Sequence, residues 1–196
     1  MLGMAEELEL LSSLGEIEGN VYNFNEIKPI IIKAAIATCD FYIENTPTDG
    51  IPFWDTGAPN LYKLGDYLNQ PSNPYNDFEP IDSSAAAIGA QGLLRLGKYL
   101  KENGEIGKGK NYWQIGLTIA DSLFAKPYLS ENENHEGLIL HSIYHRPNGW
   151  DYVPEGSKIP NGESSMWGDY HARELALYLG KIENGEKYYT FFNGLI

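Results

Sequence analysis

The sequence predicts an all-α protein, an array of paired inner and outer helices with little β-structure. Apolar residues recur at helical spacing in several separate segments. Loops of irregular length join these segments, and no sequence repeat of fixed period is visible. A chain of 196 residues fits a single domain over residues 1–196, with enough material for a sizeable core.

The helix expected over residues 83–103 organises the rest of the chain. Pro80 blocks an earlier start, and Asp82 or Ser83 can accept a hydrogen bond from the first free amides. Over the ten residues after its first two serines, the only strongly polar side chain is Gln91. The helix should therefore be buried on nearly all sides, and its many alanines and glycines predict close approach of its neighbours.

Four further helices are expected, over residues 1–14, 26–44, 111–125 and 165–180. The first has apolar residues at helical spacing from residue 1 onward, with no capping residue before them. We therefore interpret it as a helix whose start is missing. Asn25 can cap the second, which has Pro29 in its first turn. A Gly/Lys connection over residues 105–109 precedes the fourth, and either Ser164 or Ser165 caps the fifth.

The remaining segments are predicted to be loops and one extended piece. Residues 56–79 form a loop of a length that is usually functional or lines a site. Residues 137–145 are rich in β-branched and aromatic side chains and are expected to be extended, with a polar loop following to residue 163. The aromatic tail 187–192 is expected to pack back on the body.

Composition and charge limit the class of function. A net charge of −13 makes nucleic acid an unsuitable partner, because phosphate binding needs a basic surface. The single cysteine, Cys39, lies in an apolar helical run and is expected to be a core residue. No segment is long enough to cross a membrane and no signal peptide is visible, so we expect no membrane partner and a cytoplasmic, bacterial location.

The residues alone carry no recognisable catalytic motif. No glycine-rich phosphate loop, Ser/His/Asp motif, metal-ligand spacing or heptad run stands out. Four blocks, however, occur in a characteristic order: Asp49-Gly50-Ile51-Pro52-Phe53-Trp54-Asp55, Asp82-Ser83-Ser84-Ala85-Ala86, Gly137-Leu138-Ile139 with Tyr144-His145, and Met166-Trp167-Gly168-Asp169-Tyr170. This series resembles the C-terminal half of the unsaturated glucuronyl hydrolases, glycoside hydrolase family 88, and the related unsaturated rhamnogalacturonyl hydrolases of family 105.

The resemblance implies a fold and a reaction. The fold would be a six-hairpin α/α barrel (an α/α toroid), present here as a partial barrel of about five helices with one short extended segment. The family removes a 4,5-unsaturated uronic acid from oligosaccharides by protonating a vinyl ether double bond and adding water. The resemblance implies no metal and no cofactor.

Two functional features of the family have no counterpart in this sequence. The two catalytic aspartates of the family lie in its N-terminal half, which precedes the helix in which this chain starts. An R-G-Q-A-W-type motif that contacts the sugar is likewise missing. We therefore assign no catalytic residue and expect this chain alone to be inactive.

What carries over is a set of substrate-binding candidates. Tyr144 and His145 match a Y-H pair that faces the family's pocket, with Ile143 as one extra residue before them. Arg146 and Arg173 are local cations that could pair with a uronate carboxylate, or they are surface salt-bridge partners. The substrate-binding set is Tyr144, His145, Arg146, Ser164, Ser165 and Trp167.

Several residues of the matching blocks have a structural interpretation beside the functional one. Asp82 is interpreted as a helix N-cap and Asp169 as a carboxylate that favours the helix dipole or bonds a neighbouring backbone. Trp54 and Asp55 are interpreted as a buried aromatic with a turn-capping carboxylate. Trp167 is either a stacking platform for a sugar ring or a core tryptophan.

Three hypotheses for function remain open. The chain is part of a family 88/105-like hydrolase, or a catalytically inactive carbohydrate-binding or scaffold protein, or another α/α-barrel sugar enzyme with a histidine acid/base pair. The expected partner is an oligosaccharide that contains an unsaturated uronic acid. A partial barrel should leave one flank of the organising helix in water, so we also expect a homo-oligomer or a complementing N-terminal chain that covers Met4, Leu8 and Leu11.

Overall fold

The computed structural model describes residues 1–13 and 24–186, and its regular structure is helical. Within these residues the α-helices are α1 (Leu2–Ser13), α2 (Phe24–Glu44), α3 (Ser83–Glu102), α4 (Ile106–Leu123) and α5 (Met166–Glu183). The described residues contain no strand, only the isolated β-bridges Phe53–Ile81 and Leu129–Ile139. The all-α prediction is confirmed, whereas the expected contact of the tail 187–192 lies outside the described residues.

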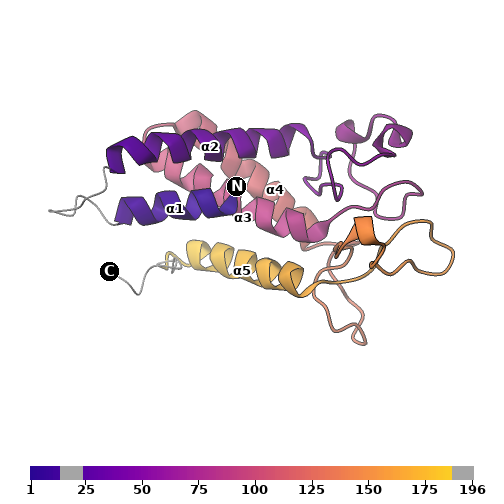
Figure 1. Ribbon diagram of the computed structural model, residues 1–196. Helices are drawn as coiled ribbons and strands as arrows, with labels where there is room; N and C mark the ends of the chain where they lie inside the picture. The colour runs from indigo at the N-terminus through magenta and orange to yellow at the C-terminus, as the bar shows by residue number, and fades with distance from the viewer. Residues whose placement is uncertain (14–23, 187–196) are drawn as a thin grey trace.

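The helices pack around α3. Helices α2, α1 and α5 run one below another in Figure 1, with α3 and α4 behind them, and α1 contacts both α2 and α3. Helix α3 contacts each of the other four helices. The loops of residues 45–82 and 124–165 gather at one end of the array, where α3 and α5 begin (Figure 1).

Helix α3 is the buried centre, as its sequence predicts. Asp82 is its N-cap and accepts a hydrogen bond of 3.0 Å from the Ser84 amide. Along the helix only Lys98 and Glu102 are exposed. The expectation that one flank of this helix faces water is therefore wrong, because α1, α4 and α5 already surround it.

The apolar stripe of α1 is covered by the chain itself. Leu8 and Leu11 are buried and Met4 is half-buried, since this helix packs on both α2 and α3. The prediction that another chain must cover this stripe is wrong for the same reason. The large apolar side chains that remain exposed on α5 are Met166, Tyr170 and Leu177.

Two glycines set the contact between α3 and α4. A Cβ on Gly97 would lie 2.8 Å from the Gly109 carbonyl oxygen, and a Cβ on Gly109 would lie 2.7 Å from the Gly97 carbonyl oxygen. Helix α4 begins at Ile106, five residues before its expected start, so the predicted Gly/Lys connection is in fact its first turn. Close backbone contact at Gly109 explains why this glycine-containing segment is helical despite its low helix propensity.

Two other helix boundaries differ from the expected ones. Helix α2 begins at Phe24, so Pro29 lies inside the helix rather than in its first turn. Helix α5 continues through Gly180 to Glu183, and the chain turns at Gly185, which has a φ of 66°. The predicted end of the helix at Gly180 is therefore wrong. Of these two glycines, Gly185 is the one in the left-handed conformation that ends helices.

A buried arginine of α3 contacts both α1 and α5. Arg95 of α3 is 1% exposed, and its guanidinium lies 2.5 Å from Glu9 and 3.5 Å from Glu6 of α1. The same guanidinium lies 4.9 Å from the ring centre of Tyr178 on α5. Burial raises the pKa of both glutamates, and the charge of Arg95 opposes that shift.

Cys39 is fully buried, and burial raises the pKa of its thiol to about 12, as befits a core residue. None of the helices in the described part of the chain has the length and apolarity required to span a bilayer.

Candidate functional site

A pocket of about 420 Å³ opens at the loop end of the array, beside the start of α5. Its walls come from α5 and from the loop that precedes it. Aromatic residues form much of the lining, which consists of Ser142, Tyr144, Trp150, Asp151, Tyr152, Pro160, Asn161, Glu163, Ser164, Ser165, Met166 and Trp167. We refer to it as the aromatic pocket.

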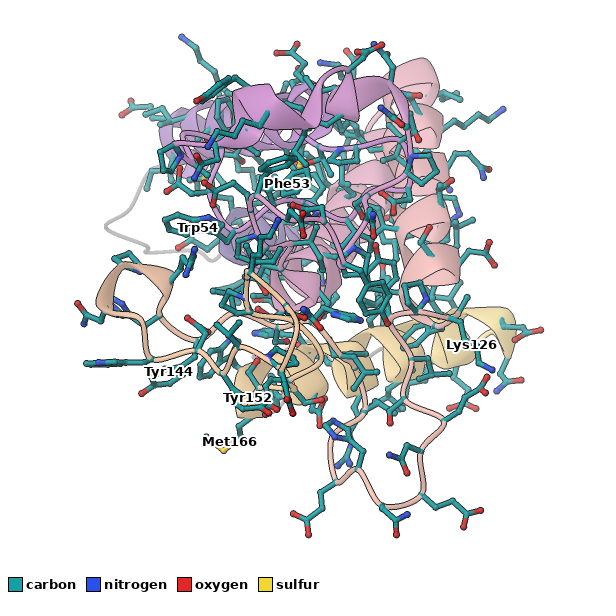
Figure 2. All side chains as sticks on the ribbon, turned by 90° about the vertical axis from the view of Figure 1, so that its right-hand side faces the viewer. Phe53, Trp54, Lys126, Tyr144, Tyr152 and Met166 are labelled. Atoms are coloured by element: carbon teal, nitrogen blue, oxygen red, sulfur yellow. The ribbon has the colours of Figure 1, made fainter. Side chains whose placement is uncertain are left out.

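Aromatic rings stand in a row along this pocket. The ring centre of Tyr144 lies 5.4 Å from that of Trp167 and 5.7 Å from that of Trp150, with both pairs tilted by 31°. Tyr144 is 59% exposed and Trp150 is 61% exposed. Figure 2, which looks onto the loop end, shows Tyr144, Tyr152 and Met166 near one another at the lower left, with Lys126 well apart from them at the right. Exposed aromatic groups of this size are typical of a binding surface.

The indole of Trp167 is fixed from behind by α3. Its Nε1 donates a hydrogen bond of 3.2 Å to the Ser84 hydroxyl, which itself donates 2.6 Å to Oδ1 of Asp82. Trp167 is half-buried, with one part held by this chain of hydrogen bonds and another lining the pocket. Trp167 is thus not a fully buried core residue, and its role as a stacking platform for a sugar ring stays a prediction.

Asp82 connects α3 to the segment that carries Tyr144. Besides its bonds to Ser84, its Oδ1 accepts a hydrogen bond of 3.3 Å from the Ile143 amide. Burial raises the pKa of Asp82, and its hydrogen bonds oppose the shift. The N-cap interpretation is confirmed, and the carboxylate also positions a wall of the pocket.

Two further aspartates hold the backbone of the segment 137–151. Asp169 accepts hydrogen bonds from the amides of Leu138 (2.8 Å) and Ile139 (3.0 Å), which confirms its structural interpretation. Asp151 accepts hydrogen bonds from the amides of Tyr144 and, at 3.1 Å, His145. The segment expected to be extended is therefore held by side chains, with Ile139 bridged to Leu129 and no strand formed within it.

The two serines before α5, Ser164 and Ser165, form different hydrogen bonds. Ser165 is the N-cap and accepts a hydrogen bond of 3.1 Å from the Gly168 amide. Ser164 donates 2.6 Å to the Ile139 carbonyl, and its oxygen lies 2.9 Å from Nε2 of His135. Because the single hydroxyl proton of Ser164 goes to the carbonyl, His135 is the donor in this pair, the reverse of an activated serine nucleophile.

The structure brings together four of the six predicted substrate-binding residues: Tyr144, Ser164, Ser165 and Trp167 line the aromatic pocket. His145 lies at its edge, with its ring centre 5.0 Å from that of Trp150, and Arg146 follows in a short 3₁₀ helix without lining the pocket. As predicted, Tyr144 lies near the start of α5, with its ring beside that of Trp167, and the amide of the preceding Ile143 reaches Asp82 at the start of α3. Arg173 lines a separate hollow along α5 that shares Met166 with the pocket.

The first of the matching blocks is structural. Nε1 of Trp54 donates a hydrogen bond of 2.8 Å to Glu79, which is buried. Asp55 accepts a hydrogen bond of 2.6 Å from the Gly57 amide and so caps a turn. The turn-capping role of Asp55 is confirmed, whereas Trp54 is half-buried against the core rather than fully buried.

Sequence reasoning missed Trp150, Asp151, Tyr152 and Glu163, which all line the pocket. All four belong to the segment 146–163, which the sequence predicts to be a polar loop. The signal that could have found them is the aromatic pair of residues 150 and 152 in a segment rich in proline, glycine and asparagine. Such large rings in a loop that needs no core residues favour a binding role.

The described residues hold no group of three histidine, cysteine or acidic side chains arranged for a metal ion. Histidines are also absent from the lining of the aromatic pocket in the part of the chain that the structure describes. The pocket therefore offers aromatic faces, hydroxyls and carboxylates, a set of groups suited to a sugar ring.

The described helices pack around α3, with the aromatic pocket at the loop end, and this arrangement can be set beside known proteins. No family model matches the chain. The sequence is 28% identical over 148 residues to an unsaturated glucuronyl hydrolase of Formosa agariphila, a match that covers 74% of this chain and 30% of that protein.

Solved structures show the same fold. The unsaturated glucuronyl hydrolase of Bacillus sp. GL1 is 23% identical, with a TM-score of 0.60 over 94% of this chain and 37% of that one. A mutant unsaturated glucuronyl hydrolase of Streptococcus agalactiae, complexed with dGlcA-GalNAc6S, is 19% identical, with a TM-score of 0.58 over 91% of this chain and 36% of that one. The chain thus has the all-α fold of these enzymes and spans about a third of their length.

Proposed function

We propose that this chain forms the sugar-binding wall of a glycoside hydrolase that acts on unsaturated uronyl (glucuronyl or galacturonyl) oligosaccharides. The observation that carries the proposal is the row of rings formed by Tyr144, Trp150 and Trp167 along a pocket at the loop end. Aromatic rings present flat apolar faces to the C–H groups of a pyranose, and the surrounding hydroxyls and carboxylates hydrogen-bond its hydroxyl groups.

The comparisons support the choice of substrate. The similar protein of Formosa agariphila is an unsaturated glucuronyl hydrolase, and the similar Streptococcus enzyme was solved with an unsaturated disaccharide. The resemblance in the four sequence blocks points to the same reaction, hydration of a vinyl ether. Positions 144, 164, 165 and 167 of those predicted for binding lie on one pocket, which agrees with that assignment.

The proposal assigns binding, not proton transfer, to the described residues. Asp82, Asp151 and Asp169 are each engaged as acceptors of backbone amides, so their role is to hold the loop. Vinyl ether hydration needs a positioned general acid, which typically contributes about 10²–10⁴-fold to the rate. We therefore expect this chain alone not to turn over the substrate.

A second candidate function rests on the same observation. A carbohydrate-binding or scaffold protein with no catalytic role would also have an aromatic pocket whose carboxylates serve the loop. The third hypothesis, a sugar enzyme with a histidine acid/base pair across the pocket, loses support, because no histidine of the described chain lines the pocket.

Binding is tested by tryptophan fluorescence during titration with an unsaturated glucuronyl disaccharide. We expect a saturable change in the wild-type chain, and a weaker affinity in Trp167→Phe. Trp113→Phe is the matched control, because Trp113 lies on α4, away from the pocket lining. An unchanged affinity in Trp167→Phe, or no binding by the wild type, would contradict the proposal.

Turnover is tested in the same samples by the ultraviolet absorbance of the unsaturated bond. We expect binding without loss of absorbance. Loss of absorbance catalysed by the purified chain would show that a catalytic acid lies within it, and Asp55, Asp82 and Asp169 would then be the residues to replace.

A further inference from the structure

We propose that Tyr62, Lys63 and Phe78 form a second saccharide-binding surface, which takes one acidic sugar residue of an oligosaccharide outside the aromatic pocket. We refer to these three residues as the loop patch. The inference goes beyond the proposed function, because it concerns another site and a saturated sugar, and it rests on that function for the class of ligand. Its starting point is a lysine that lies against two exposed aromatic rings.

The loop patch combines a cation with aromatic faces. The Nζ atom of Lys63 lies 5.7 Å from the ring centre of Tyr62 and 5.9 Å from that of Phe78, both within the range of a cation–π contact. Tyr62 is 76% exposed and Phe78 is 37% exposed, and Lys63 is exposed as well. The rings thus hold the ammonium group at the surface, where a ligand can reach both the charge and the faces beside it.

The charge of Lys63 is not balanced within the protein. No carboxylate of the described residues forms an ion pair with it, although the whole chain has a net charge of −13. The acidic side chains of the same loop have other partners: Asp55 and Asp66 accept hydrogen bonds from amide groups, Asp77 pairs with a lysine of another loop, and Glu79 is buried. The ammonium group therefore keeps its hydrogen-bond donors for an anionic ligand.

The loop patch is preformed, because a buried carboxylate fixes the loop beneath it. Glu79 is 1% exposed and accepts hydrogen bonds from the Trp54 indole, at 2.8 Å, and from both amide groups of Asn60, at 2.9 Å. Asn60 directly precedes the 3₁₀ helix η1 (Leu61–Leu64), which carries the first two residues of the patch. The third, Phe78, is the chain neighbour of Glu79. One carboxylate thus holds both parts of the patch, so little order has to be gained when a ligand binds.

The loop that carries the patch is bridged to the loop of the aromatic pocket. Asp77 lies 2.7 Å from Lys158, and two residues beyond Lys158 the side chain of Pro160 lines the pocket. In Figure 2, Trp54 lies on the same left-hand side of the loop end as Tyr144. The loop patch is therefore on the end of the molecule where the remainder of an oligosaccharide bound at the pocket would run.

The chemistry of the loop patch fits a uronate. A pyranose presents C–H groups to an aromatic face such as that of Tyr62, and the ring carboxylate accepts charge-assisted hydrogen bonds from Lys63. A neutral sugar gains the stacking alone. Because the patch offers a single cation, it suits one acidic sugar residue rather than the many phosphates of a nucleic acid.

The test is an NMR titration of the isotope-labelled full chain with a saturated hyaluronan decasaccharide, which carries uronates but no unsaturated ring. The comparison ligand is the same decasaccharide with its carboxyl groups reduced to alcohols. We expect the acidic form to bind at least about fivefold more tightly and to shift the resonances of the loop patch rather than the Trp167 indole. Lys63→Gln should bring the two affinities close together, and Tyr62→Ala should weaken the binding of both forms.

Lys110→Gln is the matched control, because Lys110 is an exposed lysine of α4 and lies outside the loop patch. It removes the same charge from the protein and should leave both affinities unchanged. Equal affinity of the wild type for the two decasaccharides, no binding of either, or equal losses in Lys63→Gln and Lys110→Gln would overturn this inference. The proposed function is judged separately by the unsaturated disaccharide and Trp167→Phe, so a failure of one can be told from a failure of the other.

Discussion

The Trp167 indole donates a hydrogen bond of 3.2 Å to the Ser84 hydroxyl, which ties the start of α5 to the start of α3. The hydroxyl proton of Ser84 is already given to Asp82, so its oxygen is left to accept from the indole. Through its bond to the Ile143 amide, Asp82 also reaches the backbone next to Tyr144. The hydrogen bonds of the Asp82 carboxylate thus help to hold both Tyr144 and Trp167 in position.

The first prediction concerns this carboxylate. Asp82→Ala removes the N-cap of α3 and leaves three donors, the amide and hydroxyl of Ser84 and the amide of Ile143, without their acceptor. We expect the free energy of unfolding to fall by about 2–4 kcal/mol. Urea denaturation followed by circular dichroism measures the change, and the variant should also bind the disaccharide more weakly, because the aromatic pair loses its support.

Two comparisons make this prediction specific. Asp82→Asn keeps a carbonyl oxygen for the same donors and should lose less than about 1 kcal/mol. Asp121→Ala replaces an exposed aspartate of α4 and should change stability by no more than about 0.5 kcal/mol. A loss in Asp82→Ala as small as that in Asp121→Ala would show that the hydrogen bonds of Asp82 do not support the fold.

The second prediction concerns the contact between α3 and α4. Gly97→Ala would place a Cβ 2.8 Å from the Gly109 oxygen and from the Trp113 amide nitrogen, which forces the two helices apart. We expect the free energy of unfolding to fall by about 1–3 kcal/mol. The measurement is again urea denaturation.

Gly107→Ala is the matched control for this substitution. Gly107 also lies in a helix of the same pair, but no atom lies within 4 Å of the Cβ that alanine would add. Alanine has the higher helix propensity, so we expect a gain of about 0.5–1 kcal/mol. If both substitutions shift stability in the same direction, close packing is not the reason for Gly97.

The sequence was sufficient for those features that depend on neighbours in the chain. The N-caps Asp82 and Ser165 and the buried character of α3 follow from local residue order, and the structure has all three. The start of α4 could not be predicted in this way. Its glycines argue against a helix locally, and only the contact of Gly109 with Gly97 stabilises one.

The features that sequence reasoning missed depend on residues far apart in the chain. The charge of Arg95 is unexpected in an apolar helix, and its burial is explained by partners far away in the sequence, above all Glu9, 86 residues earlier. At the pocket, the match of sequence blocks indicated Tyr144 and Trp167, which lie on one wall. Trp150 and Glu163 lie in a loop without regular structure, and only the folded loop places them on the same pocket.

The third prediction is that the purified chain is not a monomer. The prediction from sequence located the uncovered surface on α1, whereas the structure has it on α5, where Met166 is 85% exposed and Tyr170 and Leu177 follow on the same stripe. Apolar stripes of this kind normally pack against another surface. Light scattering measures the mass in solution, and a monomer at all concentrations would contradict the prediction of a homo-oligomer or of a complementing chain.

The last prediction concerns pH and a buried histidine beside the pocket loop. His141 is 1% exposed and adopts a φ of 68°. Its Nδ1 accepts a hydrogen bond of 3.0 Å from the Gly162 amide, so the proton of the neutral ring is on Nε2. Burial lowers the pKa of His141 to about 4, a shift that the Pro127 carbonyl opposes.

This lowered pKa predicts the direction of a pH effect on stability. In the unfolded chain a histidine has its ordinary pKa of 6.5, so between pH 6.5 and about 4 the unfolded state binds a proton that the folded state does not. His141 therefore contributes stability that is fully present above pH 6.5 and is lost as the pH falls toward 4. A difference of this size corresponds to about 3 kcal/mol.

The test is to measure the free energy of unfolding of the wild type and of His141→Asn between pH 7.5 and 4.5. Asparagine tolerates a positive φ and can accept the Gly162 amide, but it does not titrate. Glu6 and Glu9, whose raised pKa values act in the opposite direction, are present in both proteins, so their contribution cancels in the difference. We expect the wild type to lose its advantage over the variant as the pH falls, and a difference that stays constant with pH would show that His141 is protonated in the fold at little cost.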